Sequence, residues 1–183
     1  MTETVARVVE ECRQVQRKIE KLAARCDAEA WARRPSAGGW SAAECIEHLN
    51  LTSERFLPVI DEAVARARGL VGEDPGRLDL WGRLLLWWLE PPYRTGSKTP
   101  PAFVPLPGAR GQVMARFVAL QDTLCDAIAA SAGLQISNVR VSSPFDARLG
   151  YSLYSAFRVI PCHQRRRLWQ AERAAGLGGP PSS

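Results

Sequence analysis

The chain has only two histidines, His48 and His163, and each falls in a segment with helical periodicity. Imidazole is a common ligand of zinc and nickel, and helix bundles often build metal sites from inward side chains of facing helices. Such a site normally needs a third protein ligand, which we expect four residues after His163, one turn along the same face. Arg167 occupies that position. The spacing therefore makes His48 and His163 candidate ligands of a nickel or zinc ion, at a site where an arginine occupies the position of the third ligand.

Arg167 brings metal binding at this site into question. A guanidinium keeps its proton and cannot ligate a metal ion. At about 5 Å from a divalent ion, with an effective dielectric of about 20, it would be repelled by roughly 6–7 kcal/mol. Glu44, four residues before His48, is a candidate substitute ligand or a partner for Arg167. Cys45 or Cys162 is a further candidate ligand, as a thiolate.

Two alternatives without a metal stay open. In the first, Arg167 is a substrate-binding residue that holds a small anionic ligand. In the second, the two histidines are core residues with hydrogen-bonded neighbours, and the protein is a structural or homodimeric one. The sequence assigns no catalytic residue: it has no glycine-rich phosphate loop and no nucleophile elbow. Cys162 and His163 do not form a dyad, because adjacent residues of a helix point about 100° apart.

The composition indicates an ordinary globular protein. We expect a single domain over residues 1–183, with a core from about residue 4 to 175 and a flexible C-terminal tail. A net charge of +5, without a recognition motif, predicts no nucleic-acid partner. The absence of an apolar segment long enough for a secretory signal or a membrane span predicts a cytoplasmic protein. Five cysteines without a CxxC pair predict buried, reduced thiols.

The hydrophobic pattern predicts an all-α fold, a four-helix bundle with one long crossover connection. Apolar residues recur at intervals of three and four along four long segments, and no segment shows sustained strand alternation. Ser41 and Glu44 form a capping box at the start of the second helix. The four helices are expected at about Thr4–Cys26, Ala42–Arg68, Gln112–Ser131 and Ser152–Ala175. Their buried faces are expected to contain Val5, Val8, Cys12, Val15, Ile19, Leu22 and Cys26; Cys45, Leu49, Thr52, Phe56, Ile60 and Val64; Val113, Phe117, Leu120, Leu124 and Ile128; and Ala156, Ile160, His163, Arg167 and Gln170.

The crossover, from Gly69 to Gly111, is rich in glycine and proline. A short helix is expected within Leu78–Leu89, and an extended stretch from Pro100 to Pro107. The tryptophan-rich segment Trp81–Trp88 is either a lid over a site or a plug that covers one end of the core. In the last helix, Pro161 predicts a kink or a fresh helix start before His163.

Two motifs resemble those of the DinB-like (YfiT-like) proteins. The segment Trp40–Leu49, which contains His48, resembles their first metal-ligand motif. The segment that begins at His163 resembles their second, His-x-x-x-His with a glutamine three residues later. Pro91-Pro92-Tyr93 and Pro101-Ala-Phe-Val-Pro105 also resemble one branch of the family, and the similarity runs from about residue 5 to 175.

The resemblance implies a four-helix bundle with a nickel or zinc ion held by three histidines. It also implies a metal-dependent hydrolase, or a transferase of low-molecular-weight thiols, that acts on an unknown small molecule. His48 and His163 match the family's ligands, and Arg167 does not. We therefore expect a DinB-like scaffold with an altered site.

Overall fold

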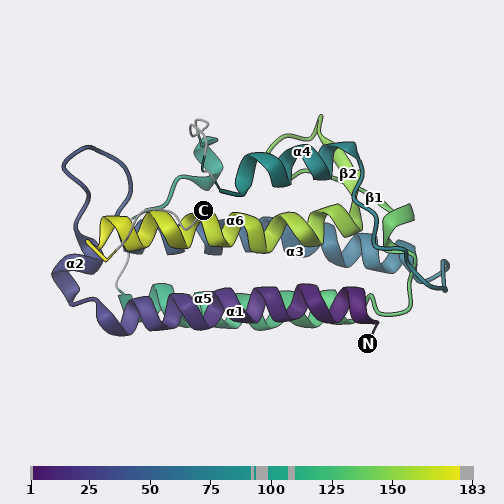
Figure 1. The fold of residues 1–183 in the computed structure, drawn as a ribbon, viewed down its shortest axis with the longest axis horizontal. Helices are drawn as coiled ribbons and strands as arrows, with labels where there is room; N and C mark the ends of the chain where they lie inside the picture. The colour runs from purple at the N-terminus through teal and green to yellow at the C-terminus, as the bar shows by residue number, and fades with distance from the viewer. Residues whose placement is uncertain (1, 92, 94–98, 107–109, 178–183) are drawn as a thin grey trace.

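Four long helices lie side by side in two layers (Figure 1). The computed structural model describes residues 2–91, 93, 99–106 and 110–177. Helices α1 (Glu3–Arg25) and α5 (Arg110–Ala129) form one layer, and α3 (Ala42–Ala67) and α6 (Leu153–Ala174) form the other. Both α1 and α3 pack against α5 and α6. The predicted helical fold is confirmed; residues 178–183, the end of the predicted tail, lie outside the described residues.

The buried faces predicted for the first three long helices form most of the core; on α6, Ala156 and Ile160 are buried, but His163, Arg167 and Gln170 are partly exposed. Every predicted position on the faces of α1 and α3 is buried, and in α5 only Leu120 is partly exposed. The capping box of Ser41 and Glu44 is present at the start of α3. All five cysteines lie in the described part of the chain as buried thiols without a disulfide, as predicted.

The last helix does not restart at Pro161. Helix α6 is a single element from Leu153 to Ala174, so the predicted fresh start is wrong. Proline removes one backbone donor, but Pro161 and its two neighbours are buried, and this packing holds the helix together. His163 and Arg167 therefore lie on one continuous helix, one turn apart.

The connection from α3 to α5 carries α4 (Leu80–Leu89) and a 3-10 helix, η1 (Pro101–Phe103). Helix α4 lies on the outer side of α6 (Figure 1). Trp81 and Trp87 are 43% and 57% exposed, so a plug of buried tryptophans is wrong for these two residues. The stretch predicted as extended contains η1 instead, because proline is well tolerated at the first position of a helical turn. Pro107 lies outside the described residues.

Hydrogen bonds among short polar side chains connect the start of α4 to the start of α6. Asp79 caps α4: its Oδ1 atom accepts hydrogen bonds from the Gly82 amide at 2.9 Å and from the Ser155 hydroxyl at 2.9 Å. Its Oδ2 atom accepts from the Ser152 amide at 2.8 Å. Gly82 lets the helices approach closely, since a Cβ atom there would lie 2.2 Å from Oγ of Ser155. The position of α4 is therefore set by the hydrogen bonds of Asp79 and by the close approach that a glycine at residue 82 permits.

Four short elements, one α-helix, two strands and one 3-10 helix, were not expected from the sequence. Helix α2 (Ala28–Ala32) is capped by Asp27, whose Oδ1 atom accepts from the Ala30 amide at 2.7 Å. Strands β1 (Arg140–Ser142) and β2 (Gly150–Ser152) pair antiparallel, with Val141 opposite Tyr151. A second 3-10 helix, η2 (Ile136–Asn138), precedes β1.

Within the described ranges, no helix has both the length and the apolar character needed to cross a membrane.

Candidate functional site

His48 is held by the connection between α3 and α5. Its side chain projects from α3 and the residue is 1% exposed. Atom Nδ1 lies 2.8 Å from the carbonyl oxygen of Phe103 in η1. A carbonyl oxygen only accepts hydrogen bonds, so Nδ1 carries the proton and Nε2 presents a lone pair. This second-sphere hydrogen bond is the type that orients histidine ligands in metal sites.

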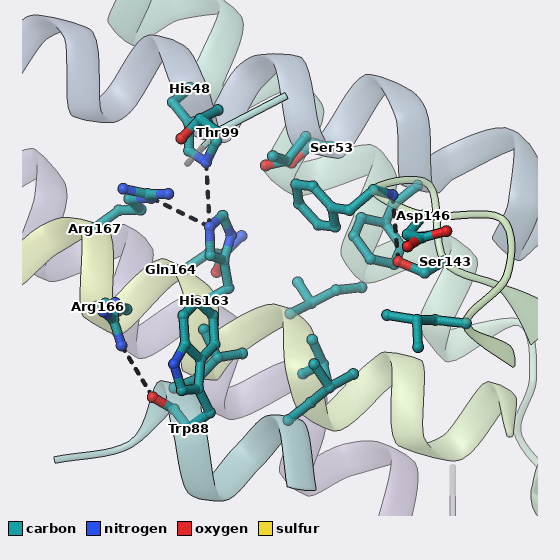
Figure 2. A pocket seen from close by; sticks show the side chains of 18 of the residues that line it. His48, Ser53, Trp88, Thr99, Ser143, Asp146, His163, Gln164, Arg166 and Arg167 are labelled. Atoms are coloured by element: carbon teal, nitrogen blue, oxygen red, sulfur yellow. Dashed lines mark hydrogen bonds between the residues drawn. The ribbon is translucent and has the colours of Figure 1, made fainter. Parts of the chain in front are cut away.

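The two histidines meet across α3 and α6 (Figure 2). Their Nε2 atoms are 3.2 Å apart, and Nε of Arg167 lies 3.2 Å from the same Nε2 atom of His163. Arginine only donates, so Nε2 of His163 also presents a lone pair. Two acceptors then face each other, and a hydrogen bond between them would require an added proton. The structure thus brings His48, His163 and Arg167, the three residues singled out in the sequence, next to one another.

Both imidazoles are held in the neutral form. Burial, and then the Arg167 charge, lower the pKa of His48 to about 3, although the Phe103 carbonyl acts in the opposite direction. Burial lowers the pKa of His163 well below its usual value, and the Arg167 charge and His48 act in the same direction. A proton shared between the rings is therefore disfavoured at neutral pH.

This shift predicts a loss of stability in mild acid. Below about pH 6.5 the unfolded chain binds protons that the folded chain excludes, so stability falls as the pH decreases. For His48 the loss is about 2 kcal/mol by about pH 5, and His163 adds to it. The measurement is urea unfolding near pH 7 and pH 5, with a chelator present, for the wild type and His48→Gln. The variant should lose less stability than the wild type; an equal loss would show that His48 titrates normally.

Arg167 is a cation without a described counter-charge. Its Nη1 atom donates to Oε1 of Gln170 at 2.8 Å, and its guanidinium carbon lies 4.9 Å from the centre of the Trp40 ring. Burial lowers its pKa to about 10, so it stays protonated at neutral pH. Among the described residues, no carboxylate forms an ion pair with it, and Nη2 has no hydrogen-bond partner. Trp40, which precedes the cap of α3, also lies 4.9 Å from the His48 ring, centre to centre.

The three consecutive arginines point in different directions, as their helical spacing requires. Arg165 pairs with Glu11 and Glu90. Arg166 donates to the Trp88 carbonyl at 3.0 Å and stacks over the Trp88 ring. Of the three, Arg167 is the one with a described hydrogen bond to the histidine pair.

The substitute ligands considered from the sequence have other partners. Glu44 accepts hydrogen bonds from the Arg34 side chain and from the Ser41 amide, at 2.8 Å and 2.9 Å. Cys162 lies 3.0 Å from a carboxylate oxygen of Glu90, and burial raises its pKa to about 12. Burial likewise raises the pKa of Cys45 to about 12. In the part of the chain that the structure describes, no three His, Cys, Asp or Glu side chains converge as metal ligands.

A cavity of about 460 Å³ opens beside the histidine pair. It lies between α3 and α6, beneath α4 and the loop that joins β1 to β2. Figure 2 shows His48, His163 and Arg167 together on one side of it, and Ser143 and Asp146 on the opposite side. The lining is mainly apolar, with contributions from Phe56, Leu85, Trp88, Leu89, Leu124, Phe145, Leu149, Val159 and Ile160. Sequence reasoning missed Phe145 and the Phe103 carbonyl, because a short irregular loop and a backbone atom carry no periodic signal.

The comparisons with known proteins give one family. The family model described as the DinB superfamily matches residues 11–171. Neither the curated proteins nor the solved structures contain a match to the chain.

Proposed function

Because the chain belongs to the DinB superfamily but carries Arg167 where the resemblance implies a third histidine, we propose that it binds a small anionic molecule without a resident metal. The observation that carries this proposal is the Arg167 guanidinium, which donates to His163 and has no described carboxylate partner. A partly buried cation is costly unless an anion compensates it. A carboxylate bound to Arg167 would provide that compensation through charge-assisted hydrogen bonds.

The donor atoms do not fit a metal ion with three protein ligands. Nε2 of His48 and Nε2 of His163 suit such an ion, because both present lone pairs and lie 3.2 Å apart. The third position, however, holds a guanidinium that donates to one of these nitrogens. It would compete with the ion for the His163 lone pair and repel its charge. The site thus supplies two ligands and a cation.

One observation favours a second candidate, the metal-dependent hydrolase or thiol transferase that the family resemblance implies. His48 donates Nδ1–H to the Phe103 carbonyl, which directs its Nε2 lone pair toward His163. This orientation is useful to a metal ligand. It would serve a bound ion if Arg167 moved away on its long side chain. The metal content of the wild-type protein separates the two candidates.

Anion-dependent thermal stabilisation tests the first proposal. With a chelator present and at constant ionic strength, acetate or inorganic phosphate should raise the melting temperature of the wild type by a few degrees. Arg167→Gln should lose this response, because the amide removes the charge. Arg55→Gln, at an exposed position on α3, is the matched control and should keep it. An unchanged response in Arg167→Gln would place the anion elsewhere and refute the proposal.

A further inference from the structure

Resting on the proposed anion site, we infer that the ligand is a monocarboxylate with an apolar alkyl or aryl body. Its carboxylate binds Arg167, and its body fills the cavity between α3 and α6. Three features carry this inference: the distribution of charge around the cavity, the character and size of its walls, and a second hollow that also borders Arg167.

Among the described residues that line the cavity, Arg167 provides the positive charge that a ligand's carboxylate can neutralise. Asp146, on the opposite side, is paired with Arg148, with a carboxylate oxygen 2.9 Å from Nη2. Arg166 is engaged by the carbonyl and the ring of Trp88. The histidines are neutral neighbours of the guanidinium. A ligand with a single negative charge therefore matches the site, and a second charged group would have to enter apolar surroundings.

The rest of the cavity suits a hydrocarbon. Leu89, Val159 and Phe145, from α4, α6 and the loop after β1, contribute apolar walls. At about 30 Å³ for each methylene-sized unit, a volume of about 460 Å³ holds a ligand of roughly ten to fifteen non-hydrogen atoms. Burying such a body supplies affinity that a small inorganic anion cannot gain.

Arg167 also borders a second hollow, of about 360 Å³, which is more open than the cavity. Thr99 lines both spaces, so the two adjoin at Arg167 and Thr99. The outer hollow contains Arg173 and Trp40, and its described lining residues include no carboxylate. A carboxylate at Arg167 would thus lie where the buried cavity meets a cationic entrance, which orients the ligand with its apolar end inward.

Calorimetric titration with a homologous series tests this assignment. The probes are acetate, butanoate, hexanoate and octanoate, with octan-1-ol as the neutral analogue, titrated into the full chain with a chelator present. We expect affinity to rise roughly fourfold for each added methylene. Octan-1-ol should bind at least about tenfold more weakly than octanoate, and Arg167→Gln should weaken octanoate by a similar factor. Arg55→Gln should bind like the wild type.

Two cavity-filling variants test where the apolar body lies. Val159→Phe, on α6, and Ser53→Leu, on α3, each add volume to the lining and should remove most of the gain with chain length. Melting curves show which variants remain folded, and either one suffices. Wild-type affinity for octanoate in a folded variant would overturn the placement of the body.

The outcomes of the titrations distinguish a failure of this inference from a failure of the proposed anion site on which it rests. If acetate and octanoate bind equally and both depend on Arg167, the apolar body is wrong and the anion site stands. If octanoate and octan-1-ol bind equally, in the wild type and in Arg167→Gln, the anion site itself is wrong. If no probe binds, both are overturned.

Discussion

The Arg167→His variant is expected to bind one zinc or nickel ion per chain, at least about 100-fold more tightly than the wild type. The change removes the guanidinium charge that would repel a divalent ion. It also places a third imidazole one turn after His163, on a helix that runs unbroken through Pro161. The Nε2 atoms of His48 and His163 are already 3.2 Å apart. The measurement is metal content by plasma mass spectrometry on tag-free protein purified without chelators, followed by calorimetric titration.

Two controls identify the cause of any gain. Arg167→Gln removes the charge without adding a ligand, so it should gain less than Arg167→His. His48→Ala in the Arg167→His background should abolish the new site, since only two imidazoles would remain. A metal-free Arg167→His protein would show that the histidine pair is not arranged for ligation. About one ion per wild-type chain would instead refute the metal-free proposal.

The second large effect is expected at the contact between α4 and α6. Gly82→Ala should destabilise the protein by about 2–3 kcal/mol, because the new methyl group would lie 2.2 Å from Oγ and 2.5 Å from Cβ of Ser155. Both atoms belong to a buried residue that bonds to the cap of α4, so they cannot simply turn away. Urea unfolding of the variant gives the size of the loss. Gly111→Ala, at a glycine of α5 with no neighbour within 4 Å, is the matched control and should be neutral or slightly stabilising.

A double-mutant cycle tests the stated cause. Ser155→Gly removes the two nearest atoms that the methyl group added by Gly82→Ala would meet, although it also removes the hydroxyl that bonds to Asp79 and Ser152. If steric overlap causes the loss, Gly82→Ala should cost less in the Ser155→Gly background than in the wild type. Equal costs in both backgrounds would assign the loss to the backbone of α4 instead. Since Leu85 and Leu89 of α4 line the cavity, Gly82→Ala should also weaken octanoate binding.

The long helices could be predicted from the sequence because each must bury one face. The buried apolar residues of α1 and α3 recur with the helical period, from Val5 to Leu22 and from Cys45 to Val64. This period depends only on residues close in the sequence, so it can be recognised without the structure. The hairpin of β1 and β2 has no such signal, since three residues per strand are too few to show alternation. The seam between α4 and α6 depends on Gly82 meeting Ser155, a pairing that only the fold creates.

The candidate site was predictable in its residue types and unpredictable in its contacts. Spacing alone indicated that His163 and Arg167 share a face, and that three consecutive arginines would diverge. It could not show that Trp40 would stack on the Arg167 guanidinium or that the Phe103 carbonyl would select the tautomer of His48. Glu44 looked equally available to the site and to its own capping box. The structure shows its carboxylate held by Arg34 and the Ser41 amide.

Because the chain has only two histidines, their ring signals in NMR spectra report on this site directly. Both imidazoles of the chain lie in it, so long-range proton–nitrogen spectra of uniformly labelled protein contain ring signals from this site alone. In the Nδ1–H tautomer of His48, the two ring nitrogens differ in ¹⁵N chemical shift, because one carries a proton and the other a lone pair. A protonated ring and a metal-bound ring each give a different pair of shifts. Occupancy, tautomer and titration of the site can therefore be followed residue by residue, without a mutation or an added probe.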